Sequence, residues 1–230
     1  MARPVDAQIV AGMDGDDRIA VNWIDSFAKR LDEEPDSFRD HQLILLRAVN
    51  PDGLIAKRPE NSRGVALNRN FPTGNYRPGG SPSAGKGPAS EPETRVMMQQ
   101  LYDLRPQRVV HVVSTPRRST AECNGVATEA TSSLSTIRSL TVANLDAKDQ
   151  PGSLEDFVTS VLGSEMVTLR LAVNDDWRAA AVTHFPTLIA ASVPQIYRGG
   201  LTATADEDAT DPSPFRVEPQ DGPRLEFDAD

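Results

Sequence analysis

Four short apolar runs, each bounded by turn-forming residues, constrain the fold of this chain more than any other feature. They are residues 7–12 (AQIVAG), 42–49 (QLILLRAV), 108–114 (RVVHVVS) and 166–173 (MVTLRLAV). Continuous apolar runs of this length are typical of strands that are covered on both faces. Stretches with helical periodicity stand between them. The pattern predicts an α/β fold with three layers, in which a mixed, mostly parallel sheet lies between helices.

Residues 17–32 are the clearest of the predicted helices. Apolar residues recur there at the 3.6-residue period, which predicts a helix with one buried face. These residues are Ala20, Trp23, Ile24, Phe27 and Leu31.

Two further helices have the start signal of a capping box. Ser90 with Glu93, and Ser153 with Asp156, have the required three-residue spacing, and they predict helices over 91–104 and 153–163. A last helix is expected over 176–192, where Pro186 should kink or split it.

Length and charge predict one folded domain and an acidic tail. The chain has 230 residues, of which 38% are hydrophobic, enough for one sizeable core, and we expect a single α/β domain over 1–200. Residues 201–230 carry nine acidic and two basic side chains, and we expect a solvated extension there. The formal charge of -9 argues against nucleic acid or an anionic membrane as partner.

Cysteine usage favours a reducing compartment. Cys123 is the single cysteine, so no internal disulfide can form, and we expect a packed thiol. The start of the chain has no apolar run of signal-peptide length, and no run of about 18 apolar residues occurs. A cytoplasmic protein is therefore expected.

Specific motifs lie within and around the long, Pro- and Gly-rich segment 50–90. They are VNPDG (49–53), RGVALNRNFP (63–72), SEPET (90–94) and PGSL followed by MVTLRL (151–171). In order and spacing, these segments resemble the zinc carboxypeptidases of the carboxypeptidase A and murein-peptide amidase type, over roughly residues 8–190.

The resemblance implies a zinc ion at the carboxyl ends of the strands, and this sequence departs from it at five positions. Asp14 and Asp17 stand in place of a His-x-x-Glu ligand pair, and Val113 stands in place of the second ligand histidine. Ala66 replaces an Asp that would orient a ligand histidine, and Arg170 replaces the catalytic Glu. We therefore expect that zinc and hydrolytic activity are lost.

The charges suggest a compensation for the loss of zinc. Replacing the metal and its acidic residues by Asp14, Asp17 and Arg170 leaves the summed charge of the site unchanged. We therefore expect Arg170 to occupy the metal position and to form charge-assisted hydrogen bonds with Asp14 and Asp17.

Part of the substrate-binding machinery of the family is still present. Asn68 and Arg69 match the pair that grips a terminal carboxylate, and Arg58 resembles the arginine that polarises the scissile carbonyl. An alternative remains that Asn68, Arg69 and Asn70 only satisfy the polar backbone of their loop.

Three functions follow from this resemblance. The first is an inactive carboxypeptidase-like protein that binds a peptide C-terminus or a small carboxylate. The second is an active zinc peptidase or amidase with a rearranged site built from Asp14, Asp17 and His111, although we expect His111 to be a core residue. The third is an interaction scaffold with a vestigial pocket, whose acidic tail binds the partner.

The start of the chain also bears on oligomeric state. Only six residues precede the first predicted strand, whereas the family normally has further strands there. We therefore expect an N-terminally shortened sheet with an exposed edge, through which the protein can form a homo-oligomer.

Overall fold

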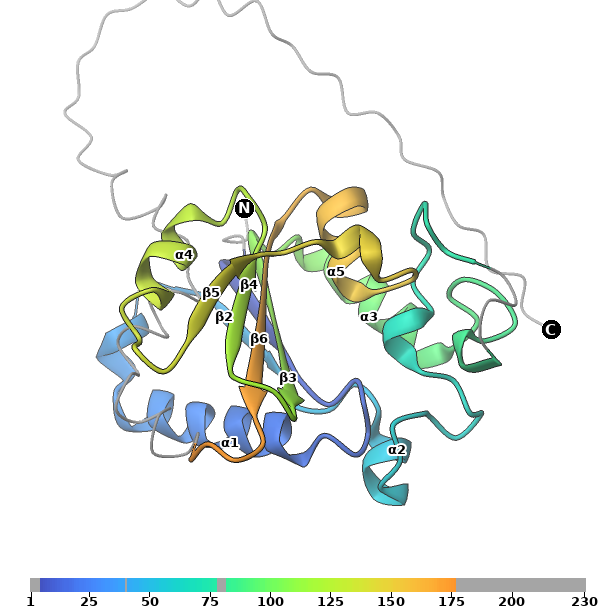
Figure 1. The fold of residues 1–230 in the computed structure, drawn as a ribbon, viewed down its shortest axis with the longest axis horizontal. Coiled ribbons are helices and arrows are strands. Elements are labelled where there is room, and N and C mark those ends of the chain that lie inside the picture. The colour runs from blue at the N-terminus through green and yellow to red at the C-terminus, as the bar shows by residue number, and fades with distance from the viewer. Residues whose placement is uncertain (1–4, 40, 78–81, 177–230) are drawn as a thin grey trace, which may run out of the picture. The chain divides into compact units, whose positions relative to one another are not determined.

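A computed structural model describes residues 5–39, 41–77 and 82–176, and its centre is a six-stranded sheet in the order β2-β1-β3-β6-β4-β5 (Figure 1). The strands are β1 (Ala7–Val10), β2 (Leu43–Leu46), β3 (Arg108–Thr115), β4 (Thr120–Cys123), β5 (Thr141–Asn144) and β6 (Glu165–Ala172). Neighbouring strands are parallel except for β4 and β6, which are antiparallel. The mixed, mostly parallel sheet is thus confirmed, with β1, β2, β3 and β6 at the four apolar runs. The sequence analysis missed β4 and β5.

Helices of very different length connect these strands. They are α1 (Arg18–Glu33), α2 (Pro51–Ala56), α3 (Pro92–Leu104), α4 (Thr128–Leu134) and α5 (Leu154–Asp156), which continues as a π-helical segment, Phe157–Leu162. Single 3₁₀ turns occur at Pro35–Phe38, Leu67–Arg69, Pro82–Ala84 and Ala147–Asp149. No helix within the described residues is long and apolar enough to cross a membrane.

Helices cover both faces of the sheet (Figure 1). On one face, α1 and α4 bury a cluster that includes Trp23, Phe27 and Leu134 against alternate residues of β3 and β6. On the other face, Met97 of α3 and Phe157 pack in a second cluster with Val109 of β3 and Met166 of β6. These two cores make the three layers that the apolar runs predict.

The predicted helix starts are partly right. Ser153 caps α5 by accepting a hydrogen bond from Asp156 N at 3.0 Å, as expected. The prediction that Ser90 caps α3 is wrong, because Glu91 is the N-cap residue and Ser90 Oγ donates to the Glu91 carboxylate. Cys123 is a buried free thiol, as expected, and burial raises its pKa.

Some predictions fall outside the described residues. The helix expected over 176–192, with Pro186, lies outside them in all but its first residue. The domain boundary at residue 200 and the acidic extension 201–230 also lie there.

Candidate binding site

A polar pocket lies at the carboxyl ends of β1, β3 and β6. Its volume is about 270 Å³, and it contains six of the positions singled out from the sequence: Asp14, Ala66, Asn68, Arg69, Val113 and Arg170. Ser114, Gln150, Pro151 and Glu155 complete its lining. The parallel strands explain this convergence, because their carboxyl ends meet at the same edge of the sheet.

The NPDG motif positions the loop that carries Asp14. Asn50 is fully buried and caps α2 by accepting a hydrogen bond from Gly53 N at 2.9 Å. Its amide also donates to Met13 O at 3.3 Å and to Pro59 O at 3.0 Å. Gly15 packs so closely that a Cβ atom added there would lie 2.2 Å from Gly53 C. The loop is therefore held rigidly at the wall of the pocket.

Asp17 is engaged within the fold. Its Oδ1 accepts a hydrogen bond from Ala20 N at 3.0 Å, which caps α1, and its Oδ2 accepts one from Ser114 N at 2.6 Å. The residue is only 9% exposed. This carboxylate links the start of α1 to the end of β3. It makes no hydrogen bond or ion pair with Arg170.

Arg170 pairs with a residue that the sequence analysis did not consider. Its Nε donates to Glu122 Oε1 at 2.9 Å and its Nη2 to Glu122 Oε2 at 3.1 Å. Glu122 lies on β4, which runs antiparallel to β6 with Thr120 opposite Arg170. The prediction that Arg170 bridges Asp14 and Asp17 is therefore wrong, because an unpredicted strand brings a carboxylate within its reach.

Glu155 and His111 form a buried pair behind the pocket. Each side chain is 1% exposed, and Glu155 Oε1 lies 2.7 Å from His111 Nδ1. Asn68 Nδ2 donates to Glu155 Oε2 at 3.1 Å, and Thr168 Oγ1 donates to Oε1 at 3.3 Å. Burial raises the pKa of Glu155, but the charge and hydrogen bond of His111, with a backbone bond and Asn68, outweigh it and lower the pKa to about 2.

His111 is thus a core residue, as expected, but one with a charged partner. Its other ring nitrogen, Nε2, is buried with no hydrogen-bond partner among the described residues. Because Nδ1 faces Glu155, the histidine is oriented by a carboxylate inside the core.

The three polar residues carried over from the family have different environments. Asn68 is half-buried, and its Oδ1 accepts a hydrogen bond from Leu154 N at 2.7 Å, which joins its loop to the start of α5. Arg69 is exposed and lines the pocket, and its side chain contacts no partner within the part of the chain that the structure describes. Arg58 does not line the pocket and donates to Asn61 O at 2.7 Å.

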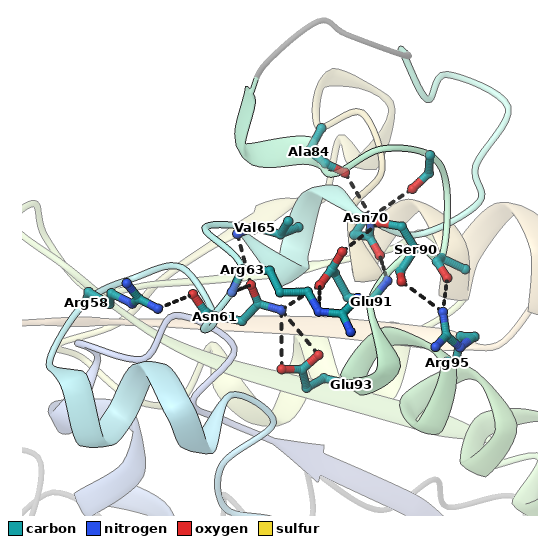
Figure 2. A network of polar contacts seen from close by, with 12 residues as sticks. Arg58, Asn61, Arg63, Val65, Asn70, Ala84, Ser90, Glu91, Glu93 and Arg95 are labelled. Atoms are coloured by element: carbon teal, nitrogen blue, oxygen red, sulfur yellow. Dashed lines mark hydrogen bonds and ion pairs between the residues drawn. The ribbon is translucent and has the colours of Figure 1, made fainter. Parts of the chain in front are cut away.

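Asn70 organises the loop that follows (Figure 2). Its Nδ2 donates to the carbonyls of Ala84 and Gly87 at 2.8 and 3.0 Å and to Ser90 Oγ at 3.0 Å. Its Oδ1 accepts from Glu91 N at 3.1 Å. This asparagine therefore satisfies buried loop backbone, which is the structural role considered as the alternative for the whole motif.

Asn61 serves the same purpose on the other side of the network (Figure 2). Its Oδ1 accepts from the backbone nitrogens of Arg63 and Val65, both at 3.0 Å. Its Nδ2 donates to Glu91 Oε2 at 2.9 Å and reaches both carboxylate oxygens of Glu93 at 3.3 Å. The SEPET motif is thus bound to the loop. Of Asn68, Arg69 and Asn70, Arg69 is the residue that lines the pocket without a side-chain partner among the described residues.

Asp14 is the remaining charged residue of the pocket wall. It is exposed, and no side-chain hydrogen bond to it occurs among the described residues. Partial loss of hydration at the pocket wall raises the pKa of this carboxylate, the negative charges of Asp17, Asp16 and Glu155 raise it further, and His111 lowers it in part.

The residues present do not fit the zinc ion that the resemblance implies. Val113 offers no donor atom, and both carboxylate oxygens of Asp17 accept hydrogen bonds from backbone nitrogens. Across the described ranges, no group of three His, Cys, Asp or Glu side chains is placed to hold a metal ion. The rearranged site of Asp14, Asp17 and His111 is therefore not assembled as a ligand set.

Glu122 and Glu155 are the site residues that sequence reasoning missed. The segment TAEC alternates, with Ala121 and Cys123 buried and Thr120 and Glu122 less so, which is the signature of a short strand. Four positions are too few for this alternation to identify a strand from the sequence, so Glu122 was missed. Glu155 follows directly on PGSL, but a carboxylate in a helix start normally suggests a solvated residue.

Residues 17–121 match the family model described as zinc carboxypeptidase. Murein peptide amidase A from Escherichia coli (strain K12) is 33% identical over 116 residues, which cover 44% of this chain and 46% of that protein. The matched region thus spans about half the length of this curated relative.

The fold is similar to solved structures over most of the chain. Murein-tripeptide amidase from Escherichia coli O157 gives a TM-score of 0.62 at 21% identity, covering 83% of this chain and 81% of that one. Carboxypeptidase A from Helicoverpa armigera gives 0.66 at 15% identity, covering 82% and 60%. Residues 17–121 are thus similar to the zinc carboxypeptidase family, and the described fold is that of the solved murein-tripeptide amidase and carboxypeptidase structures.

Proposed function

We propose that this chain is a carboxypeptidase-like pseudoenzyme, which binds a peptide C-terminus or a small carboxylate without hydrolysing it. The observation that carries this proposal is Arg69, a pocket-lining guanidinium without a protein partner among the described residues. An arginine of this kind can bind a carboxylate through two parallel hydrogen bonds.

The absence of hydrolysis is supported by what occupies the catalytic positions. Arg170 is a permanent cation held by Glu122, and it cannot act as a general base. Asp17 is satisfied by backbone nitrogens, and Val113 has no ligand atom. We therefore expect no zinc cofactor and no peptide-bond cleavage.

Carboxylate binding can be tested by calorimetric titration with N-acetyl-L-phenylalanine, which imitates a peptide C-terminus. Its amide derivative, which lacks the carboxylate, is the ligand control. Arg69→Ala should weaken binding of the acid about tenfold or more, since a charge-assisted bidentate contact is lost. Lys29→Ala removes the same charge at a side chain that is 79% exposed on α1, and it should leave binding unchanged.

Hydrolysis is tested separately. The protein supplied with zinc should release no hippurate from hippuryl-L-phenylalanine. Zinc-dependent release that a chelator abolishes would contradict the pseudoenzyme, and equal affinity for the acid and its amide would contradict the carboxylate site.

We also propose self-association through the edge of the sheet, and a cytoplasmic location. In the described sheet, β2 is an edge strand whose four residues are all half-buried. The buried free thiol of Cys123 is compatible with a reducing compartment.

A further inference from the structure

The pocket holds four charged side chains, and they fall into two classes. Glu155 is paired with His111 and Asn68, and Arg170 is paired with Glu122. The other two, Asp14 and Arg69, have no side-chain partner among the described residues. The two charges that remain available to a ligand are therefore opposite in sign.

The backbone that carries Asp14 is held at the wall of the pocket. The loop around it is fixed by the buried Asn50 and by the close approach of Gly15 to Gly53. The carboxylates of Asp17 and Glu155 repel its charge, and its partial loss of hydration in the pocket raises its pKa. A cationic group placed beside Asp14 would relieve both effects.

We propose that the pocket binds a small zwitterion, whose carboxylate contacts Arg69 and whose ammonium group contacts Asp14. This inference rests on the proposed carboxylate site and adds the chemical class of the ligand. The pocket volume of about 270 Å³ lies just below the range of roughly 300–1,000 Å³ that holds drug-sized molecules, so a ligand of amino-acid size fits it.

A free amino acid and a peptide C-terminus differ at the group that faces Asp14. The amino acid presents an ammonium group, whereas the peptide end presents a neutral amide nitrogen. The amide would leave Asp14 without a counter-charge in a site where hydration is reduced. The pocket should therefore prefer free amino acids.

The test compares three ligands that share a phenyl ring and a carboxylate. L-Phenylalanine carries the ammonium group, N-acetyl-L-phenylalanine has an amide there, and 3-phenylpropionate has neither. Titration calorimetry at pH 7 and low salt should give L-phenylalanine a dissociation constant about tenfold lower than either analogue. Alanine against propionate repeats the comparison without the aromatic ring.

Asp14→Asn should remove this preference, so that the variant binds L-phenylalanine no more tightly than it binds 3-phenylpropionate. Asp16→Asn is the matched control, since Asp16 is an exposed neighbour that does not line the pocket, and it should keep the preference. An unchanged melting temperature would show that both variants are folded.

The outcomes separate this inference from the proposed function. Equal affinities of the wild type for L-phenylalanine and 3-phenylpropionate, both lost in Arg69→Ala, would overturn the zwitterion and leave the carboxylate site intact. A preference that survives in Asp14→Asn would likewise overturn it. Failure of all the carboxylates to bind, or binding that does not depend on Arg69, would overturn the carboxylate site and the zwitterion with it.

Discussion

Arg170 lies on β6 with its side chain 28% exposed, beside the 24% exposed side chain of Glu122. The two residues form a bidentate ion pair, at the position where the resemblance to zinc carboxypeptidases implies a catalytic base. Partial exposure weakens such a pair, because solvent screens both charges.

The pairing predicts the outcome of a double-mutant cycle. Arg170→Met combined with Glu122→Gln should show a coupling energy of about 1 kcal/mol in the free energy of unfolding, as expected for a bidentate pair that is partly exposed. Urea denaturation of the four proteins measures it.

The same cycle with Asp14 provides the control. Arg170→Met combined with Asp14→Asn should be additive, because the structure has no hydrogen bond between these side chains. Strong coupling to Asp14 and none to Glu122 would restore the bridge expected from the sequence.

Glu155 makes stability depend on pH in a defined window. Its pKa is lowered from 4.5 to about 2 in the folded protein, so its contribution is complete above pH 4.5 and is lost as the pH falls from about 4.5 to about 2. A shift of this size corresponds to a few kcal/mol at most. Thermal unfolding between pH 7 and pH 2 should show this loss.

Glu155→Gln should reduce stability at pH 7 and flatten the acid limb of the profile, since the amide cannot titrate. Glu33→Gln, at a side chain that is 48% exposed on α1, should keep the shape of the wild-type profile. An acid limb that is identical in Glu155→Gln and the wild type would contradict the assignment.

At the scale of elements, the start of α1 is held by Asp17, whose two carboxylate oxygens accept hydrogen bonds from different elements. The side chain caps the helix through Ala20 N and also satisfies Ser114 N at the end of β3. Asp17→Ala should therefore lower the free energy of unfolding by about 1–3 kcal/mol, more than an ordinary cap, because a second backbone nitrogen loses its partner.

Asp16→Ala is the neighbouring control, since this exposed residue makes no side-chain hydrogen bond with the described residues. Chemical denaturation should place it within about 0.5 kcal/mol of the wild type. Equal destabilisation by both changes would indicate that helix charge, rather than the cap, matters at Asp17.

The elements also show what could be predicted from the sequence. The long helix α1 and the four apolar strands have strong periodicity, and they were found because many residues agree on one interpretation. The four-residue strands β4 and β5 have too few positions for a reliable period. Because β4 was missed, its Glu122 was missed as the partner of Arg170.

The sequence indicated which residues line the pocket, but it did not indicate which of their side chains contact one another. Six of the positions singled out from the motifs line one pocket. The pairing of charged side chains depends on strand register and on the path of the loops. The summed charge of the site gives no information about either. Asn68 illustrates the point, since its amide binds Leu154 N and Glu155 from an element 86 residues further along.

At the scale of the whole molecule, the feature to test is the edge of β2, which has no strand on its outer side among the described residues. Gln42 O and Leu46 O accept hydrogen bonds from the β1 side, from Ala7 N and Ala11 N. In a strand, alternate residues point their N–H and C=O groups to opposite sides, so Leu43 and Leu45 direct theirs away from β1. An added strand could pair with them.

The edge predicts self-association that a charge would block. The wild type should show a concentration-dependent dimer in light scattering after size exclusion, and Ile44→Lys on β2 should be a monomer. Ile55→Lys, at a residue that is 82% exposed on α2, should dimerise like the wild type. A wild type that stays monomeric at all concentrations would refute the edge contact.

The two hydrogen bonds of Asp17 have a consequence for protein engineering. A designer who wished to install a metal at this pocket would need the carboxylate of residue 17 as a ligand, and redirecting it would strip α1 of its cap and free the end of β3. Such a design would therefore first need a new interaction that links α1 to β3. Metal ligands could be added at residues 14 and 113 only after that.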